Sequence, residues 1–174
     1  MKTKLKILVA IIPLVFVLDQ ITKRVIVHFI PLGSSIPVIP GIFDLVHTRN
    51  RGAAFGVMAD LPDSVRMPLF FVVSFLALAL ITVYFFKIRE ERASVYFGLS
   101  LILGGACGNI WDRIFLGEVI DFLSFHWYDK AVDLALGGWR LRFKLEWPAF
   151  NVADAAITIA VFWLMILMMR PNKR

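Results

Sequence analysis

The stretch VYFGLSLILGGACGNIWDRIFLGEVIDF, residues 95–122, decides the fold. Residues 95–115 are predominantly apolar, and as a helix they are long enough to cross a hydrocarbon core of about 30 Å. Polar side chains then gather at one end of this run, where Asn109, Asp112 and Arg113 precede Asp121. A carboxylate near hydrocarbon costs at least about 2.5 kcal/mol, so an ionisable residue at this position is a functional-site hypothesis.

Three further apolar runs of similar length lie at residues 7–30, 67–86 and 152–169. The chain is 59% hydrophobic and 18% charged, whereas a soluble domain is usually about 45–50% apolar and about 25% charged. The first run follows Lys2, Lys4 and Lys6 as a signal peptide would, but no small-residue cleavage site comes after it. We therefore expect a single integral-membrane domain, residues 1–174, with four transmembrane helices.

Basic residues indicate the orientation of the spans, because short cytoplasmic flanks are enriched in Lys and Arg. Three short flanks on one side of the membrane hold nine of the 19 basic residues, namely Lys2, Lys4, Lys6, Lys87, Arg89, Arg92, Arg170, Lys173 and Arg174. The remaining basic residues are spread over two longer segments, 31–66 and 116–151, and the span ends beside them. This density predicts that both termini are cytoplasmic and that the two longer segments lie outside.

The two outer segments show strand patterns. In the first, the pieces 36–39, 43–48 and 53–58 are separated by Pro and Gly, which is typical of short strands joined by turns. In the second, WRLRFKLEW at 139–147 alternates apolar and charged residues as a half-buried strand does. Residues 128–136 are expected to form one or two helical turns that stop at a Gly pair. We predict a small mixed sheet and a short outer helix on the outer membrane surface.

Asp121 and Asp154 lie at the same end of adjacent spans, which suggests a shared site. Two carboxyl groups that share one proton can activate water, as in aspartic proteases. The residues therefore favour an intramembrane aspartic peptidase. A structural alternative exists for Asp154, because Asn151 and Asp154 have the spacing of a helix capping box with Asp in place of Glu.

Other polar residues fall at the same depth of the predicted bundle. Asp19 and Lys23 are four residues apart in the first span, so an i,i+4 ion pair is an alternative to a supporting role in the site. Asn109 and Arg113 share a helix face in the third span, and Asn50 lies in the outer segment that returns toward them. The opposite halves of the spans carry almost no polar groups, which argues against a transporter or a channel.

Several other classes are disfavoured by the residues present. The three histidines share no metal-ligand spacing, so no zinc site is expected. Cys107 lies among glycines in an apolar run, where a packing role is favoured over a reactive thiol. The net charge of +6 is explained by lipid contacts beside the spans, so no nucleic-acid partner is expected. A dication-dependent membrane phosphotransferase, using Asp112, Asp121 and Asp154, and a structural membrane protein remain as rival classes.

Taken together, the motifs resemble bacterial lipoprotein signal peptidase, also called signal peptidase II. The similarity runs along the whole chain in order. It is carried by Asp19-Gln20 with Lys23, Asn50 with Gly52-Ala53-Ala54-Phe55-Gly56, Gly104-Gly105-Ala106 with Gly108-Asn109 and Asp112-Arg113, Gly117 and Val119 with Asp121-Phe122, and Phe150-Asn151 with Ala153-Asp154. Each piece is weak alone, and five in the right order make chance agreement very unlikely.

The resemblance implies a four-span aspartic peptidase with an extracytoplasmic β-cradle, in the bacterial inner membrane, with its active site at the outer leaflet. It implies that Asp121 and Asp154 are the catalytic pair, with no metal or cofactor. The supporting and substrate-binding positions it implies are Asp19, Lys23, Asn50, Gly52, Asn109, Arg113 and Asn151.

The implied substrate is a prolipoprotein whose Cys already carries diacylglycerol, cut on the amino side of that Cys. Membrane phospholipids, inhibition by a cyclic depsipeptide of the globomycin type and a monomeric state are also expected. One departure from the family pattern is a longer stretch between Asp121 and Asp154, at residues 128–147.

Overall fold

The computed structural model describes residues 2–51, 62–88, 92–136 and 139–169. The elements follow one another as α1 (Lys2–Phe29), β1 (Ser35–Ile39), β2 (Phe43–Asn50), α2 (Asp63–Lys87), α3 (Ala93–Leu116), β3 (Val119–Leu136), β4 (Trp139–Phe150) and α4 (Val152–Met169). Within this described part, four helices are long and apolar enough to cross a membrane. The fold class of four membrane-spanning helices with a small β-sheet is confirmed.

The third helix is the centre of the bundle. In the α3 span 61% of the residues are buried, against 11%, 6% and 17% in α1, α2 and α4. These three helices pack around α3 and expose long apolar faces, as expected for helices surrounded by lipid. A hydrophobic cluster fills the bundle at the end away from the sheet; its buried members are Phe85, Val95, Tyr96, Leu99, Leu103 and Leu167.

Small residues on α3 let its neighbours approach closely. A Cβ added at Gly104 would lie 2.9 Å from the Val15 Cβ of α1, and one at Gly105 would lie 2.5 Å from the Ala153 carbonyl oxygen of α4. Any larger residue would push the helices apart. This glycine-rich stretch of α3 therefore serves close helix packing.

The four strands form one sheet in the order β1-β2-β3-β4, and every neighbouring pair is antiparallel. The expected mixed sheet is therefore wrong. Short connections join β1 to β2 and β3 to β4, and β3 returns antiparallel to β2 after the helices α2 and α3. The strands expected near residues 36–39, 43–48 and 139–147 are confirmed as β1, β2 and β4. The third expected piece, 53–58, lies outside the described residues.

The short outer helix expected over residues 128–136 is wrong, because this segment is the distal part of β3. Its apolar residues recur at every second position, and the register pairs Val132 with Phe143 and Leu134 with Leu141 of β4. Alternating residues that face a partner strand of the same period form a ladder in preference to a single helical turn.

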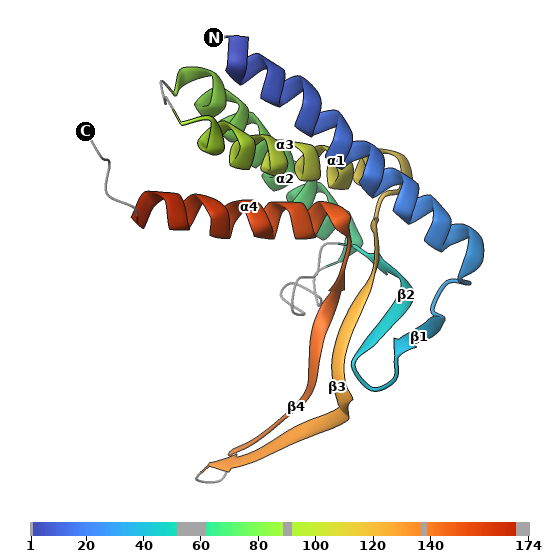
Figure 1. Ribbon diagram of the computed structural model, residues 1–174. Coiled ribbons are helices and arrows are strands. Elements are labelled where there is room, and N and C mark those ends of the chain that lie inside the picture. The colour runs from blue at the N-terminus through green and yellow to red at the C-terminus, as the bar shows by residue number, and fades with distance from the viewer. Residues whose placement is uncertain (1, 52–61, 89–91, 137–138, 170–174) are drawn as a thin grey trace.

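The helices and the sheet meet at one end of the bundle (Figure 1). The start of α1 and the end of α4 lie at the opposite end. At the junction α3 ends at Gly117, whose backbone φ of 75° is the left-handed conformation that commonly ends helices. Two residues later β3 begins, and β4 leads directly through Asn151 into α4. The junction therefore gathers the end of α3 and the starts of β3 and α4.

Candidate active site

A buried lysine lies at the centre of the junction. The Lys23 Nζ of α1 is 2.8 Å from Asp19 Oδ2 and 2.8 Å from Asp112 Oδ2 of α3. All three residues are at most 1% exposed. A buried charge is tolerated only when it is paired and hydrogen-bonded. The expected i,i+4 ion pair of Asp19 with Lys23 is confirmed, and Asp112 completes it from a second helix.

The carboxylates of this charged cluster (Asp19, Lys23 and Asp112) also hold neighbouring elements in place. Asp19 Oδ1 accepts the backbone N–H of Ala153, in the first turn of α4, at 3.0 Å. Asp112 Oδ2 accepts the N–H of Ile120, in β3, at 3.2 Å. These two bonds fix the backbone immediately before Asp121 and Asp154.

Gln20 belongs to the same cluster, and sequence reasoning did not assign it to the site. Its Nε2 donates to Asp112 Oδ1 at 2.9 Å, to Asp19 Oδ2 at 3.2 Å and to the Gly108 carbonyl at 3.4 Å. A glutamine inside a membrane span, directly after Asp19, was the available signal. The sequence does not indicate that Asp112 supports the carboxyl pair, because its partner Lys23 lies in another helix.

Two asparagine side chains connect the charged cluster to the candidate catalytic pair. Asn109 Oδ1 accepts from Lys23 Nζ at 3.1 Å and from Asn151 Nδ2 at 3.1 Å. Because its oxygen faces these donors, the Asn109 amide nitrogen faces away and donates to Asp154 Oδ1 at 2.7 Å. Asn151 Nδ2 in turn reaches Asp121 Oδ1 at 2.8 Å. The two amides therefore lie between Lys23 and both carboxyl groups.

Asn151 and Asp154 also form the capping box that their spacing indicated. The Asp154 N–H donates to Asn151 Oδ1 at 3.0 Å, and the Asn151 N–H donates to Asp154 Oδ2 at 3.2 Å. Reciprocal bonds of this kind satisfy two otherwise unpaired donors at the start of α4. The capping role is thus confirmed. It also orients the Asp154 carboxyl group, so it is compatible with a role in the site.

Asp121 is the more enclosed of the two carboxyl groups, at 3% exposure. Its Oδ2 accepts from Asn50 Nδ2 of β2 at 3.1 Å, opposite the bond from Asn151. Burial first, and then the negative charge of Asp154, raise the pKa of Asp121 to about 7, against the hydrogen bonds from Asn50 and Asn151. A carboxyl with this pKa exchanges a proton near neutrality.

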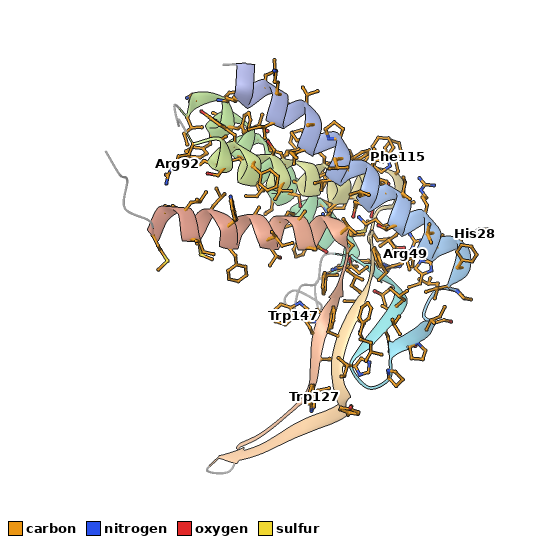
Figure 2. The ribbon with its side chains drawn as sticks, viewed as in Figure 1. His28, Arg49, Arg92, Phe115, Trp127 and Trp147 are labelled. Atoms are coloured by element: carbon orange, nitrogen blue, oxygen red, sulfur yellow. The ribbon has the colours of Figure 1, made fainter. Side chains whose placement is uncertain are left out.

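Asp154 is half-buried and lies at the edge of an apolar groove between the sheet and α4. The groove has a volume of about 550 Å³. The sheet contributes Phe125, Trp147 and Phe150 to its lining, and α4 contributes Asp154, Ala155, Thr158 and Ile159. Trp147 extends from β4 into the space below α4 (Figure 2). A single carboxyl group thus faces an otherwise almost wholly apolar groove.

Arg113 and Asn50 line a smaller cavity of about 180 Å³, with Met67, Pro68, Phe70 and Phe71 of α2. The guanidinium donates to the Asn109 carbonyl at 3.3 Å, and its charge acts on Asp154 and Asp121. Arg113 and Asn109 share a face of α3, as expected. The apolar groove is lined by Asp154 itself, and the smaller cavity is lined by Asn50, which donates to Asp121, and by Arg113.

Of the nine expected site residues, the structure brings eight into one hydrogen-bonded or electrostatically coupled group: Asp19, Lys23, Asn50, Asn109, Arg113, Asp121, Asn151 and Asp154. The ninth, Gly52, lies outside the described residues. These residues come from α1, β2, α3, β3 and α4, so their meeting is a property of the whole fold.

Comparison with known proteins identifies the family. The family described as "Signal peptidase (SPase) II" matches residues 11–170. A lipoprotein signal peptidase of Geobacter sulfurreducens is 42% identical over 174 residues, covering 100% of this chain and 98% of its own. Another, of Syntrophotalea carbinolica, is 38% identical over 169 residues, covering 97% and 94%.

The fold is likewise shared with a solved protein, described as "Bacterial membrane enzyme structure by the in meso method at 2.3 A resolution". The TM-score is 0.72 at 30% identity, over 100% of this chain and 93% of that one. Sequence and structure agree over nearly the full length. The chain belongs to the signal peptidase II family.

Proposed function

We propose that Asp121 and Asp154 form the catalytic pair of a membrane aspartic endopeptidase that removes signal peptides from prolipoproteins. Membership of the signal peptidase II family makes the chain a peptidase of this class. The assignment rests on the two side-chain amides, of Asn109 and Asn151, that connect the two carboxyl groups. Asn109 donates to Asp154 and Asn151 donates to Asp121, and Asn151 also donates to Asn109.

We assign the shared proton of the resting pair to Asp121. This carboxyl is almost fully buried, and its pKa is raised to about 7 by burial and by the charge of Asp154. Asp154 accepts two N–H bonds, from Asn109 and from the Asn151 backbone, so both of its oxygens act as hydrogen-bond acceptors. The proton belongs to the pair as a whole, and this assignment describes its main form.

The cleavage step follows from this division. The Asp154 carboxylate takes a proton from water as the water oxygen bonds to the scissile carbonyl carbon. Asp121 gives its proton to the carbonyl oxygen, so the tetrahedral species is a neutral diol. Asp154 then returns its proton to the peptide nitrogen, the C–N bond breaks, and Asp121 regains a proton from one hydroxyl. The products are a carboxylic acid and an amine, and the pair is restored.

The apolar groove beside Asp154 supports a lipidated substrate. Its lining is aromatic and aliphatic on both sides, with Trp147 on β4 and Ile159 on α4. A prolipoprotein carrying diacylglycerol on its Cys would bring apolar chains to the same place as the scissile bond. We propose cleavage on the amino side of that Cys. Membrane anchoring of the substrate then supplies much of the proximity that catalysis needs.

The second cavity supports a role for Arg113 and Asn50 in holding polar parts of the substrate. Arg113 presents a fixed positive charge to a cavity that is otherwise lined mainly by α2 side chains. Carbonyl and ester oxygens of the bound lipoprotein are the groups that this charge would attract. Asn50 meanwhile keeps one hydrogen bond on Asp121.

The arrangement of the termini supports the orientation in the membrane. The start of α1 and the end of α4 lie at the end of the bundle opposite the carboxyl pair (Figure 1). The short basic flanks occur at this same end, including Lys4, Lys87 and Arg92. By the enrichment of such flanks in the cytoplasm, we place both termini inside and the carboxyl pair at the outer leaflet of the bacterial inner membrane.

Resemblance to the family supports three further proposals about partners. Membrane phospholipids surround the four helices, and a cyclic depsipeptide of the globomycin type inhibits the enzyme. The active form is a monomer, since the described part of one chain already supplies both carboxyl groups and their amide donors.

The test is cleavage of a diacylglyceryl prolipoprotein by the purified enzyme in vesicles, with a chelator present. Wild type should cut, and Asp121→Asn and Asp154→Asn should lose at least about 10³-fold in kcat. Asp44→Asn is the matched control, because this aspartate of β2 lies 3.4 Å from His126, away from the pair. Thermal melts of all four proteins should show that they are folded.

Two outcomes would overturn the proposal. Near-normal turnover by a folded Asp121→Asn or Asp154→Asn protein would remove that residue from the pair. Loss of wild-type activity with the chelator would instead favour dication chemistry. Asp112 is a poor third ligand for such an ion, because Gln20 binds its Oδ1 and Lys23 and Ile120 bind its Oδ2.

A further inference from the structure

The distal part of the β3–β4 hairpin has no role in the site described above. We call residues 129–136 of β3 and 139–145 of β4 the arm. The strand β2 pairs with β3 only as far as the partners Phe43 and Phe125, so the described pairing of the arm is between β3 and β4 alone. In Figure 1 the arm extends past the rest of the sheet and away from the helices that carry the candidate site.

The arm leaves the sheet at a defined bend. The β3–β4 register shifts between His126 and Ala131, and Tyr128 there has a positive backbone φ of 46°. The Tyr128 N–H donates to the Gly41 carbonyl at 2.7 Å. The Tyr128 ring lies so close to Gly41 that a Cβ there would be 2.5 Å from it. The bend is therefore held by the folded sheet, which sets the direction of the arm.

The bend changes the direction of the hairpin relative to α4. Up to the bend the strands run away from α4, and beyond it the arm runs below α4 in the direction in which α4 itself runs, at a distance from the helices (Figure 1). If the sheet lies on the outer membrane surface, as proposed above, this turn directs the arm back to the lipid and not into the outer compartment.

The register of the arm separates its residues into two faces, because successive residues of a strand lie on opposite faces. On one face the paired positions are Val132 with Phe143, Leu134 with Leu141, and Leu136 with Trp139. On the other face the pairs are Ala131 with Lys144, Asp133 with Arg142, and Ala135 with Arg140. Over these six pairs one face is wholly apolar, and the other carries three basic positions and one acidic one. Next to the bend, the same alternation puts Asp129 on the charged face and Lys130 on the apolar face.

Such a hairpin needs a partner for its apolar face. A lone two-stranded hairpin is marginally stable at best in water, and a contiguous apolar face exposed to water is rare unless it marks an interaction site. Three aromatic side chains at the root of the arm are exposed: Trp127 is 51%, Tyr128 57% and Trp147 62% accessible. Trp and Tyr concentrate at the boundary between lipid and water.

We propose that the arm lies in the headgroup layer of the outer leaflet, beside the four helices, and binds anionic phospholipid there. The apolar face would contact the acyl-chain boundary, and Arg140, Arg142 and Lys144 would bind lipid phosphates. Charge complementarity identifies the partner as anionic lipid. The apolar face suits the acyl chains, and the three cations of the other face suit anionic headgroups. The proposal rests on the outer location of the sheet given under the proposed function.

The first test measures the depth of adjacent positions in the full-length protein. Single cysteines replace Leu141 or Arg142 in a Cys107→Ser background, carry a nitroxide label, and are reconstituted in phosphatidylglycerol–phosphatidylcholine vesicles. A label at 141 should collide with oxygen, which concentrates in lipid, and a label at 142 with an aqueous nickel chelate. Ser34→Cys, in the exposed turn before β1, is the water-exposed control.

Two results would overturn the proposal at this stage. If labels at 141 and 142 are both as accessible to the nickel chelate as the label at 34, the arm extends into water. A second possibility is that spin–spin coupling broadens the spectrum of the label at 141, and that dilution with unlabelled protein removes this broadening. In that case a second copy of the chain covers the arm, and the lipid assignment is wrong.

The second test separates anionic lipid from lipid in general. With Arg140→Gln, Arg142→Gln and Lys144→Gln combined, or in phosphatidylcholine alone, the label at 141 should gain access to the nickel chelate. Each basic residue near an anionic surface contributes about 1 kcal/mol, or roughly fivefold in the bound fraction. An unchanged label at 141 in both conditions would show that the basic face does not bind anionic headgroups.

Cleavage assays on the same vesicles distinguish this proposal from the proposed function. The nine proposed site residues are untouched by these substitutions, so the triple Gln protein should retain the carboxyl pair. A protein whose arm is in lipid but whose Asp121→Asn variant still cuts would contradict the catalytic assignment alone. Normal cutting with the arm in water would contradict the arm proposal alone.

Discussion

Lys4 and Lys23 are two lysines of α1 that lie at opposite ends of the bundle, and their surroundings differ completely. Lys4 Nζ lies near the rings of Phe85 and Tyr96, at 4.9 and 5.0 Å from their centres, and donates to the Phe86 carbonyl at 3.2 Å. Lys23 Nζ is 1% exposed and lies between two carboxylates.

The comparison shows what the buried charge is used for. Lys4 is half-buried at a helix end, where aromatic faces and a carbonyl suffice to hold an ammonium group. Lys23 needs two carboxylates, and the third acceptor it finds is the Asn109 amide oxygen. That third bond sets the direction of the amide nitrogen toward Asp154. One end of the bundle thus only anchors a charge, and the other uses a charge to orient the candidate catalytic pair.

The largest expected effect is on the stability of Lys23→Met. This substitution leaves Asp19 and Asp112 buried without their cation, which should cost about 3–5 kcal/mol in the free energy of unfolding. Lys4→Met is the matched control and should cost no more than about 1 kcal/mol. Reversible denaturant unfolding in mixed micelles measures both. Adding Asp19→Asn and Asp112→Asn to Lys23→Met should recover part of the loss. Equal losses of stability in Lys23→Met and Lys4→Met would contradict the claim that only Lys23 neutralises buried carboxylates.

A second substitution tests the amide that Lys23 orients. Asn109→Leu removes the N–H donor to Asp154 while retaining the size of the side chain, so the carboxyl should lose its orientation. We expect kcat to fall about 10²-fold, as misplacement of a reacting group by about 1 Å can cause. Thr82→Val, which removes a hydroxyl bonded within α2 to the Leu78 carbonyl, is the control. An unchanged kcat in Asn109→Leu would show that the amide does not position Asp154.

A smaller effect should come from the open side of the site. Thr158→Trp would fill the apolar groove between the sheet and α4 without touching the charged cluster. KM for the prolipoprotein should rise about tenfold, which corresponds to about 1.4 kcal/mol of lost binding, with kcat changed little. Ile166→Trp, on an exposed part of α4 outside the groove, should leave KM unchanged. Equal KM values for the two tryptophan variants would show that substrate does not use the groove.

A further expected effect is a change in how stability depends on pH. The folded-state pKa of Asp121 is raised to about 7 from 3.8, so folded protein binds this proton more tightly than unfolded protein does. Wild-type stability should therefore decrease as pH rises from about 4 to about 7. Asp121→Asn lacks this titration, so its melting temperature should gain on that of wild type over the same interval. Parallel curves for the two proteins would show that Asp121 has an ordinary pKa.

The sequence alone predicted the four spans and most of the residues that the structure brings together in the candidate site. Length and hydropathy predicted the four helices, and a carboxylate beside an apolar run identified Asp121 without structural help. Asp154 was ambiguous, because a capping box and a catalytic role need the same residue at the same place. The structure shows that one side chain has the capping bonds and also faces the groove.

The sequence did not reveal contacts between distant segments. Asp112 binds Lys23 across two helices, and Gln20 bridges the same carboxylates, yet neither has a local pattern that names its partner. The prediction of helical turns at residues 128–136 is wrong, because a short apolar segment can adopt either structure and its partner strand decides which. Tertiary pairing decided all three cases.

The pH dependence of kcat/KM tests most directly the claim that Asp121 and Asp154 share a proton. With vesicle-bound enzyme and a diacylglyceryl prolipoprotein, kcat/KM should decrease as pH rises through about 7, where free Asp121 loses its proton and can no longer donate to the scissile carbonyl. A value of kcat/KM that stays constant or rises through neutrality would contradict the account, because the buried carboxyl would then not be the proton donor.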